Sequence, residues 1–268
     1  NLARYFTQED PDYIISTHFL ASEVAAHLKR SQKIRATVIT VITDYAVHPF
    51  WITRGTDRYI VASEYTKKIA VHEGIPEDRI TVCGIPVSPK FSEQLNRRQI
   101  AEKLGVKPEM FTVLISTGSF GIGPAEKLIQ ELCDQIQVIM VCAHNTKLYD
   151  YLTAKQYPNC VVYGFVSNMH ELMAVSDVIV AKPGGKTVSE SLIMRLYPIF
   201  FVAIPGQEQE NVRFLNSHGI GILTKDIIRI KHMIIELKTN PTILSSLKAK
   251  IDLIRKPNAA GEITDALC

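Results

Sequence analysis

The sequence predicts an α/β protein with two units, each a parallel sheet covered by helices. Short segments rich in Val and Ile alternate with stretches of helical periodicity along the 268 residues, a pattern typical of strands buried on both faces. Glycine and proline cluster between Gly84 and Pro89, and such punctuation is typical of a linker. Beyond this linker, glycine-rich turns twice join a strand to a helix, as in doubly wound sheets.

The first half, residues 1–88, predicts only part of a Rossmann-like domain. Asp12–Thr17 has the composition of a strand, and Leu20–Ser31 has the apolar spacing of a helix. The other expected elements here are strands at Ala36–Thr43, Tyr59–Ala62 and Ile80–Cys83 and a helix at Glu64–Glu73.

The second half, residues 89–268, predicts a complete six-stranded Rossmann-like domain. It opens with a helix near Arg97–Leu104 and a strand at Thr112–Ser116. Five further strands are expected at Val138–Cys142, Val161–Phe165, Val178–Ala181, Ile199–Val202 and Gly221–Leu223, with helices between them. The last stretches, Ile227–Leu237 and Thr242–Leu267, are expected to be helical and to close the domain.

Composition excludes several classes of protein. With 46% hydrophobic and 21% charged residues the chain is an ordinary globular protein, and no apolar run approaches the length of a membrane-spanning helix. A net charge of +3 is too balanced to indicate nucleic-acid binding and leaves room only for weak attraction to an anionic membrane. Five cysteines without a C-x-x-C pair, and histidines without ligand spacing, predict reduced core thiols and no metal site.

Two glycine-rich turns predict phosphate binding in the second half. Ser116–Pro124 leaves a strand and enters a helix, so Gly118 and Ser119 are expected to bring backbone and hydroxyl donors to a phosphate. The second turn runs through Pro183, Gly184, Gly185, Lys186 and Thr187, whose free amides would hold a diphosphate at the start of the next helix. Glu190, one turn further on, has the carboxylate that a ribose diol requires. The alternative for each turn is a simple connection between strand and helix.

Two further polar segments follow predicted strands. Gln207, Glu208 and Asn211 offer donors and acceptors to several sugar hydroxyls, although a solvated helix start has the same composition. In the first half, His18, Asp44 and His48 are titratable groups at strand ends that are suited to acting as a general base or orienting a hydroxyl. A structural hydrogen bond is the alternative role for either histidine.

These segments carry a resemblance to a known family. The relevant motifs are Thr43-Asp44 followed by His48-Pro49-x-Trp51, Pro183-Gly184-Gly185 through Glu190, and Pro205-Gly206-Gln207-Glu208-x-x-Asn211. The sequence resembles the diacylglycerol glycosyltransferases related to plant monogalactosyldiacylglycerol synthases and bacterial processive diacylglycerol glucosyltransferases. It is more distantly similar to the transferase that adds N-acetylglucosamine to lipid I.

The resemblance implies a GT-B fold, in which two Rossmann-like domains face each other across a cleft and the C-terminal one holds a UDP-sugar. Phe165 and Val166 would then meet the uracil and Glu190 the ribose. Gly118, Ser119 and residues 185–187 would meet the diphosphate, and Gln207, Glu208 and Asn211 the sugar. The implied reaction is inverting transfer of a hexose, glucose rather than galactose, to diacylglycerol, without a metal, at the inner face of the cell membrane.

The same resemblance leaves alternatives open. The family's glycine-rich loop ending in histidine has no counterpart in residues 1–268, so the N-terminal domain is expected to be incomplete and Asp44 and His18 become the local candidates for acceptor activation. Tyr45, Phe50 and Trp51 would line a lipid path or pack in the core. The other possible functions are transfer to another lipid-linked acceptor, sugar-nucleotide epimerisation, and non-catalytic binding of a sugar nucleotide.

Overall fold

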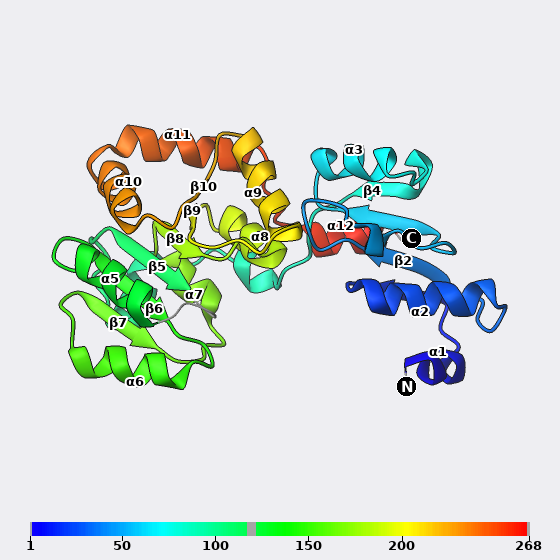
Figure 1. Ribbon diagram of the computed structural model, residues 1–268, viewed down its shortest axis with the longest axis horizontal. Coiled ribbons are helices and arrows are strands. Elements are labelled where there is room, and N and C mark those ends of the chain that lie inside the picture. Colours follow the sequence, from blue (N-terminus) through cyan, green and yellow to red (C-terminus); the bar gives the residue numbers. More distant parts are fainter. Residues whose placement is uncertain (1, 117–121, 267–268) are drawn as a thin grey trace.

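The computed structural model, which describes residues 2–116 and 122–266, contains two parallel sheets side by side along the long axis of the molecule (Figure 1). Helices cover both sheets, and the predicted pair of α/β units is confirmed.

The first sheet has the strand order β1-β2-β3-β4, and all its neighbouring strands are parallel. These strands are β1 (Tyr13–Ser16), β2 (Thr37–Val41), β3 (Arg58–Val61) and β4 (Ile80–Val82). The helices that accompany them are α1 (Leu2–Glu9), α2 (Phe19–Arg30) and α3 (Glu64–His72), of which α1 was not predicted. Local capping sets the helix starts, since His18 accepts the N–H of Leu20 at α2 and Ser63 that of Thr66 at α3.

The second sheet has six parallel strands in the order β10-β9-β8-β5-β6-β7. They are β5 (Thr112–Ser116), β6 (Gln137–Val141), β7 (Cys160–Tyr163), β8 (Val178–Ala181), β9 (Tyr197–Phe200) and β10 (Ile222–Leu223). Numbered within this unit and read from β7, the strand order is 3-2-1-4-5-6. The chain therefore adds strands first on one side of β5 and then on the other, and the order reverses between β5 and β8. Ligands of doubly wound sheets bind at the carboxyl ends of the strands beside such a reversal.

Eight helices accompany these strands: the first precedes β5, five lie between successive strands, and the last two follow β10. They are α4 (Arg97–Leu104), α5 (Ile122–Leu132), α6 (Thr146–Lys155), α7 (Met169–Ala174), α8 (Gly185–Ile193), α9 (Gln207–Ser217), α10 (Ile227–Thr239) and α11 (Pro241–Asp252). Three short 3-10 helices, η1 (Pro49–Trp51), η2 (Glu77–Arg79) and η3 (Pro89–Ser92), lie in loops.

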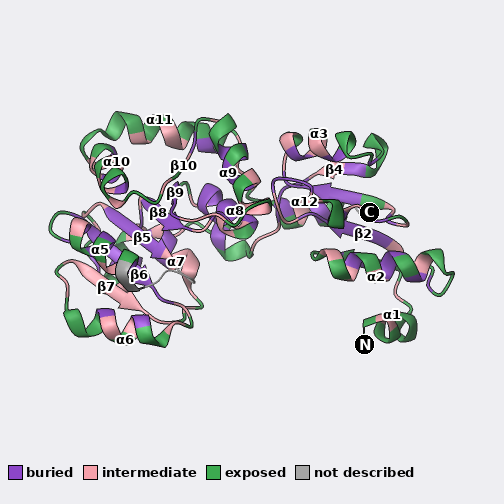
Figure 2. Cartoon of the chain, in the orientation of Figure 1, coloured by how far each residue is buried: buried purple, intermediate pink, exposed green. Residues whose placement is uncertain are grey.

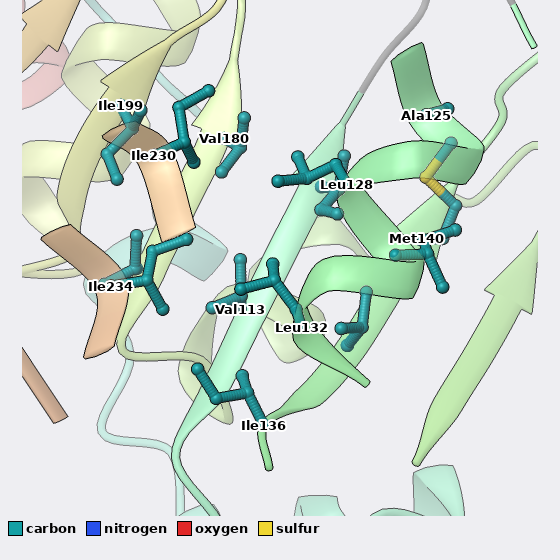
Figure 3. Close-up of a cluster of buried hydrophobic side chains, with 14 of the residues drawn as sticks. Val113, Ala125, Leu128, Leu132, Ile136, Met140, Val180, Ile199, Ile230 and Ile234 are labelled. Atoms are coloured by element: carbon teal, nitrogen blue, oxygen red, sulfur yellow. The ribbon is translucent and has the colours of Figure 1, made fainter. Parts of the chain in front are cut away.

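The four central strands of the second sheet, β5, β6, β8 and β9, are buried on both faces (Figure 2). On one face, Leu128 and Leu132 of α5 and Ile230 and Ile234 of α10 pack against strand residues such as Val113 (Figure 3). On the other face, a separate apolar cluster joins α4 and α7 to the sheet. Each fully buried aliphatic side chain contributes about 1.5–3 kcal/mol of transfer free energy, so this double-sided core makes the sheet a rigid base for the residues at its edge.

The last helix, α12 (Ala259–Asp265), returns to the first sheet (Figure 1). Its Ile263 packs with Ile39, Val41 and Ile60 of β2 and β3 and with Cys83. Arg58 of β3 also donates a hydrogen bond of 2.6 Å to the carbonyl of Ala266. The predicted second domain, residues 89–268, includes this helix, but by its contacts α12 completes the first unit, because it covers a face of that sheet that would otherwise be exposed.

The sequence predicted reduced cysteines and no membrane-spanning helix. Within the described ranges Cys83, Cys133, Cys142 and Cys160 are unpaired, and burial raises the pKa of each thiol. None of the helices in the described part of the chain is both long enough and apolar enough to cross a bilayer.

The role of α12 predicts the effect of truncating its buried side chain. Replacing Ile263, which is 6% exposed, by Ala should lower the free energy of unfolding by about 2 kcal/mol, because it leaves a cavity against β2 and β3. Replacing Leu253, which is 85% exposed, by Ala is the control and should change it by less than about 0.5 kcal/mol. Urea denaturation of both variants measures this, and equal stabilities would show that α12 does not support the first sheet.

Candidate active site

A cavity of about 410 Å³ lies where the two units meet. The first unit contributes Asp44 and His48 to its lining, and the second contributes Gly184, Gln207 and Glu208. The remaining lining residues are mostly apolar: Phe19, Phe50, Ile204, Pro205 and Gly206. Folding thus brings together predicted site residues from distant parts of the chain. Asp44 and Asn211, for example, are hydrogen-bonded although they are 167 positions apart.

Asn211 joins the two units beneath this cavity. Its side-chain amide donates to the Asp44 carboxylate at 3.2 Å and to the carbonyl of Pro183 at 2.9 Å. Its side-chain carbonyl accepts the N–H of Tyr45 at 2.8 Å. Asn211 is wholly buried, and its contacts hold Asp44 and Tyr45 against the second unit. Its predicted contact with the sugar stays a prediction.

Tyr45 is the apolar part of the same junction. Its ring stacks on Phe214 with centroids 4.1 Å apart, and its hydroxyl lies 3.0 Å from the Ser189 hydroxyl of α8. Burial raises the pKa of Tyr45 to about 12. Tyr45 and Trp51 are 5% and 2% exposed, so of the two alternatives, a lipid path or core packing, the structure shows core packing for both. Phe50, in contrast, is 65% exposed and lines the cavity.

Gly185, the first residue of α8, allows the backbones of the two units to touch. A Cβ atom at this position would lie 2.0 Å from the carbonyl oxygen of Thr43, a distance no side chain tolerates. The sequence predicted Gly185 as a diphosphate contact, and the structure adds a second reason for a glycine here. The start of α8 is thereby fixed directly against Asp44.

Burial is the main cause that raises the pKa of Asp44 above its usual value. The hydrogen bond from Asn211 lowers this pKa, and the negative charge of Glu208 raises it. The Glu208 carboxylate also accepts the N–H of Ile204, a hydrogen bond that stabilises the loop before α9. Asp44 is therefore a carboxylate with raised basicity on the wall of a cavity, as a general base requires.

The two predicted histidines both cap a helix through Nδ1. His48 lines the cavity and accepts the N–H of Phe50 through Nδ1 at 3.3 Å. His18 accepts the N–H of Leu20 through Nδ1 at 3.2 Å and stacks on Phe19, which lies at the cavity wall. In each ring Nδ1 is thus occupied by a backbone N–H, and Nε2 is the ring nitrogen that remains for a ligand.

The donor-side residues lie around the reversal point of the second sheet. Gly184 is the N-cap of α8 and no side chain caps this helix, so the amides of Gly185, Lys186 and Thr187 belong to its open first turn. Glu190 is 6% exposed and burial raises its pKa, while Lys186 lies 3.5 Å away and lowers it. Gly118 and Ser119 lie outside the described residues.

The start of α9 faces the cavity through Gln207 and Glu208. Gly206 precedes it with φ of +93°, a backbone conformation that favours glycine, and no side chain caps the helix. Two open helix N-termini, those of α8 and α9, therefore meet at this junction, and both favour negative charge.

At the far side of the second sheet, Phe165 follows β7 and is 67% exposed. Its ring stacks on His144, which follows β6. Val166 is partly buried and packs against the core cluster of α4 and α7. Of the two residues predicted to meet a uracil, Phe165 is the one with an exposed ring.

Sequence reasoning missed Phe19, Ile204 and His144. Phe19 follows β1, and Ile204, which is 55% exposed, follows β9. In both places the sequence pointed only to the polar residues. An apolar residue directly beside a predicted polar site was the available signal for both. Among the residues that the structure describes, no group of three or more metal-ligating side chains gathers at one place.

The close contact at Gly185 predicts a large effect of a single added methyl group. Replacing Gly185 by Ala should lower the free energy of unfolding by about 3 kcal/mol, because the backbone of Thr43 must move away. Replacing Gly184 by Ala is the matched control, because a Cβ there meets nothing within 4 Å. It should lower the free energy of unfolding by less than about 1 kcal/mol. Thermal unfolding compares the two variants, and equal melting temperatures would contradict a direct contact between the units.

Comparisons with known proteins agree with this geometry. The family model described as monogalactosyldiacylglycerol (MGDG) synthase matches residues 1–87, and the glycosyltransferase family 28 C-terminal domain matches residues 112–249. Two solved structures share the fold over 99% of this chain at 17% identity: MurG of Acinetobacter baumannii, with a TM-score of 0.68 and 76% of its chain covered, and UDP-GlcNAc 2-epimerase of Neisseria meningitidis, with 0.73 and 78%.

Two of the most similar curated relatives are both called processive diacylglycerol beta-glucosyltransferase. The protein of Staphylococcus carnosus (strain TM300) is 32% identical over 252 residues, which is 92% of this chain and 64% of the relative. That of Bacillus cereus (strain 03BB102) is 31% identical over 265 residues, 97% of this chain and 68% of the relative. The chain thus spans about two thirds of the length of these relatives, and it belongs to the diacylglycerol glycosyltransferase family, with the GT-B fold and a C-terminal domain of glycosyltransferase family 28.

Proposed function

We propose that the protein transfers glucose from UDP-glucose to the free hydroxyl of diacylglycerol, with inversion at the anomeric carbon. The observation that carries this proposal is the cavity between the two units, where the half-buried carboxylate of Asp44, whose pKa is raised, lies with the open N-termini of α8 and α9 and with an apolar rim formed by Phe19, Phe50 and Ile204. The names of the curated relatives support the choice of glucose and of diacylglycerol.

The donor binds the second unit in this proposal. The open first turn of α8 holds the diphosphate, Glu190 accepts hydrogen bonds from the ribose, and Gln207 and Glu208 bind the sugar from the start of α9. Asn211 acts indirectly, because its contacts orient Asp44.

Asp44 is the proposed general base. As the acceptor oxygen forms its bond to the anomeric carbon, the hydroxyl proton passes to Asp44, and the bond from that carbon to the diphosphate oxygen breaks with its electron pair going to UDP. The amides at the start of α8 stabilise the charge that develops on the leaving diphosphate, without a cation.

The apolar rim accounts for the lipid acceptor. Phe50 and Ile204 are 65% and 55% exposed on opposite units and lie on the same cavity with Phe19. Apolar side chains around a polar floor suit a molecule with a hydroxyl head and acyl chains. We place the protein peripherally at the inner face of the cell membrane, where such an acceptor and a UDP-sugar meet.

The direct test is turnover of UDP-glucose with vesicles that contain diacylglycerol, using the protein together with any residues that precede Asn1 in its gene, in a buffer with EDTA. Glucosyldiacylglycerol is the expected product. Isomerised or hydrolysed sugar nucleotide without acceptor would indicate an epimerase, and UDP binding without any turnover would indicate a non-catalytic module; either result contradicts the proposal.

Replacing Asp44 by Asn should lower kcat by about 100- to 10,000-fold, since the amide cannot accept the acceptor proton. The affinity for UDP should stay unchanged, because Asp44 belongs to the first unit and Asn preserves its shape. Steady-state kinetics and calorimetry measure the two quantities. A variant that retains full kcat would remove Asp44 from the mechanism.

The environment of Asp44 also predicts the pH dependence of kcat. A base must be ionised, so activity should fall as the pH is lowered through the raised pKa of Asp44, at a higher pH than an exposed aspartate would give. Replacing Glu208 by Gln removes a nearby negative charge and should shift this acid limb to lower pH, whereas replacing Asn211 by Ala removes a hydrogen bond to the carboxylate and should shift it to higher pH. Shifts of both variants in the same direction would argue against Asp44 as the titrating group.

A further inference from the structure

Tyr45 follows Asp44 directly, and each of its three polar groups is bonded to a different helix. Its N–H donates to the side-chain carbonyl of Asn211 in α9 at 2.8 Å, and its carbonyl accepts the Thr66 hydroxyl of α3 at 3.0 Å. Its own hydroxyl lies 3.0 Å from the hydroxyl of Ser189 in α8. A phenylalanine ring would pack equally well at this place, so packing alone does not account for the hydroxyl and its partner.

The first unit holds the carbonyl of Tyr45 through two hydroxyl groups in series. A carbonyl cannot donate, so the hydroxyl proton of Thr66 points at Tyr45, and the Ser63 hydroxyl, 3.0 Å away, donates to Thr66. Ser63 in turn accepts the N–H of Thr66 at 3.2 Å, and Thr66 is wholly buried. The start of α3 therefore fixes the backbone just after Asp44 within its own unit.

Helix α8 touches the segment 43–45 at two places that are one turn apart. Gly185 lies against the carbonyl of Thr43, and Ser189, four residues further on, meets the Tyr45 hydroxyl. Residues four apart lie on the same face of a helix, about 6 Å apart along its axis. One contact would leave the helix free to tilt about it, whereas two contacts this far apart fix its direction.

The direction of α8 matters for the proposed reaction, because the free amides of its first turn point along the helix axis. A diphosphate held by these amides moves with the helix, and the sugar attached to it moves with the diphosphate. Asp44 lies on the segment that the two contacts join to α8. The distance from its carboxylate to the reacting carbon therefore depends on the angle between α8 and this segment, and a misplacement of about 1 Å can lower a rate about 100-fold.

We infer that Tyr45 is a positioning residue for the transfer: its hydroxyl contact with Ser189 sets the angle at which α8 presents the donor to Asp44. This inference rests on the proposed function, because it concerns the alignment of the same donor with the same base. Both side chains are buried, Tyr45 at 5% and Ser189 at 4% exposed, and they act through the segments that they join.

Replacing Tyr45 by Phe removes the hydroxyl and keeps the ring on Phe214. In the turnover assay with UDP-glucose and diacylglycerol vesicles, kcat should fall about 3- to 10-fold because the donor is misaligned. The KM for UDP-glucose and the calorimetric affinity for UDP should stay unchanged, because the second unit holds the donor. Replacing Ser189 by Ala should lower kcat by the same factor, and the double variant should lose no more than either single variant.

Tyr59 offers a matched control, because it is a buried tyrosine of the same unit whose hydroxyl bonds within that unit. It accepts the N–H of Thr53 and donates to the carbonyl of Thr53, each at 3.0 Å. Replacing Tyr59 by Phe should lower the melting temperature, as Tyr45→Phe does, but should leave kcat unchanged. The comparison separates an effect on alignment from an effect on stability.

Three results would overturn the inference alone: wild-type kcat in the Tyr45→Phe variant, additive losses in the double variant, or an equal fall of kcat in the Tyr59→Phe variant. Loss of UDP affinity in parallel with kcat would also overturn it, because Tyr45 would then support the fold as a whole. If the unaltered protein makes no glucosyldiacylglycerol, the proposed function fails, and the inference fails with it.

Discussion

The contact between Gly185 and Thr43 sets the geometry on which the rest of the site depends. The two units meet there with no room for a Cβ atom, so the start of α8 lies directly against the loop after β2 that carries Asp44. Asn211 fixes this position by hydrogen bonds to both sides, and Tyr45 seals it with Phe214. Because Asn211 is wholly buried, breaking its hydrogen bonds would leave unsatisfied polar atoms in the junction.

This junction divides the chemistry between the units. The second unit offers helix N-termini, which favour the negative charge of a leaving diphosphate, and the first offers a carboxylate whose pKa burial has raised. Two residues of the second unit act on the pKa of Asp44 in opposite directions: the hydrogen bond from Asn211 lowers it, and the negative charge of Glu208 raises it. The apolar side chains Phe50 and Ile204 then surround a polar floor.

Sequence patterns predicted much of this fold, because strand composition and helical spacing are local properties: the predicted strand at Thr112–Ser116 and helix at Arg97–Leu104 agree with the structure. They failed where the decisive contact is distant in the chain. Nothing near Ile263 indicates that α12 covers the first sheet. Nothing near Asn211 indicates its hydrogen bond to Asp44, 167 positions away. Likewise the sequence left Tyr45 and Trp51 as residues either of a lipid path or of the core, and their burial shows that they belong to the core.

The central claim is that a UDP-sugar spans the edge of the second sheet and presents its sugar to Asp44 across the junction. A crystal structure of the protein with UDP measures this most directly. The diphosphate should lie at the open first turn of α8, the ribose beside Glu190, and the sugar-bearing end of the nucleotide should point into the 410 Å³ cavity. Nucleotide density at any other place on the protein, or the same place with the diphosphate turned away from Asp44, would contradict the account.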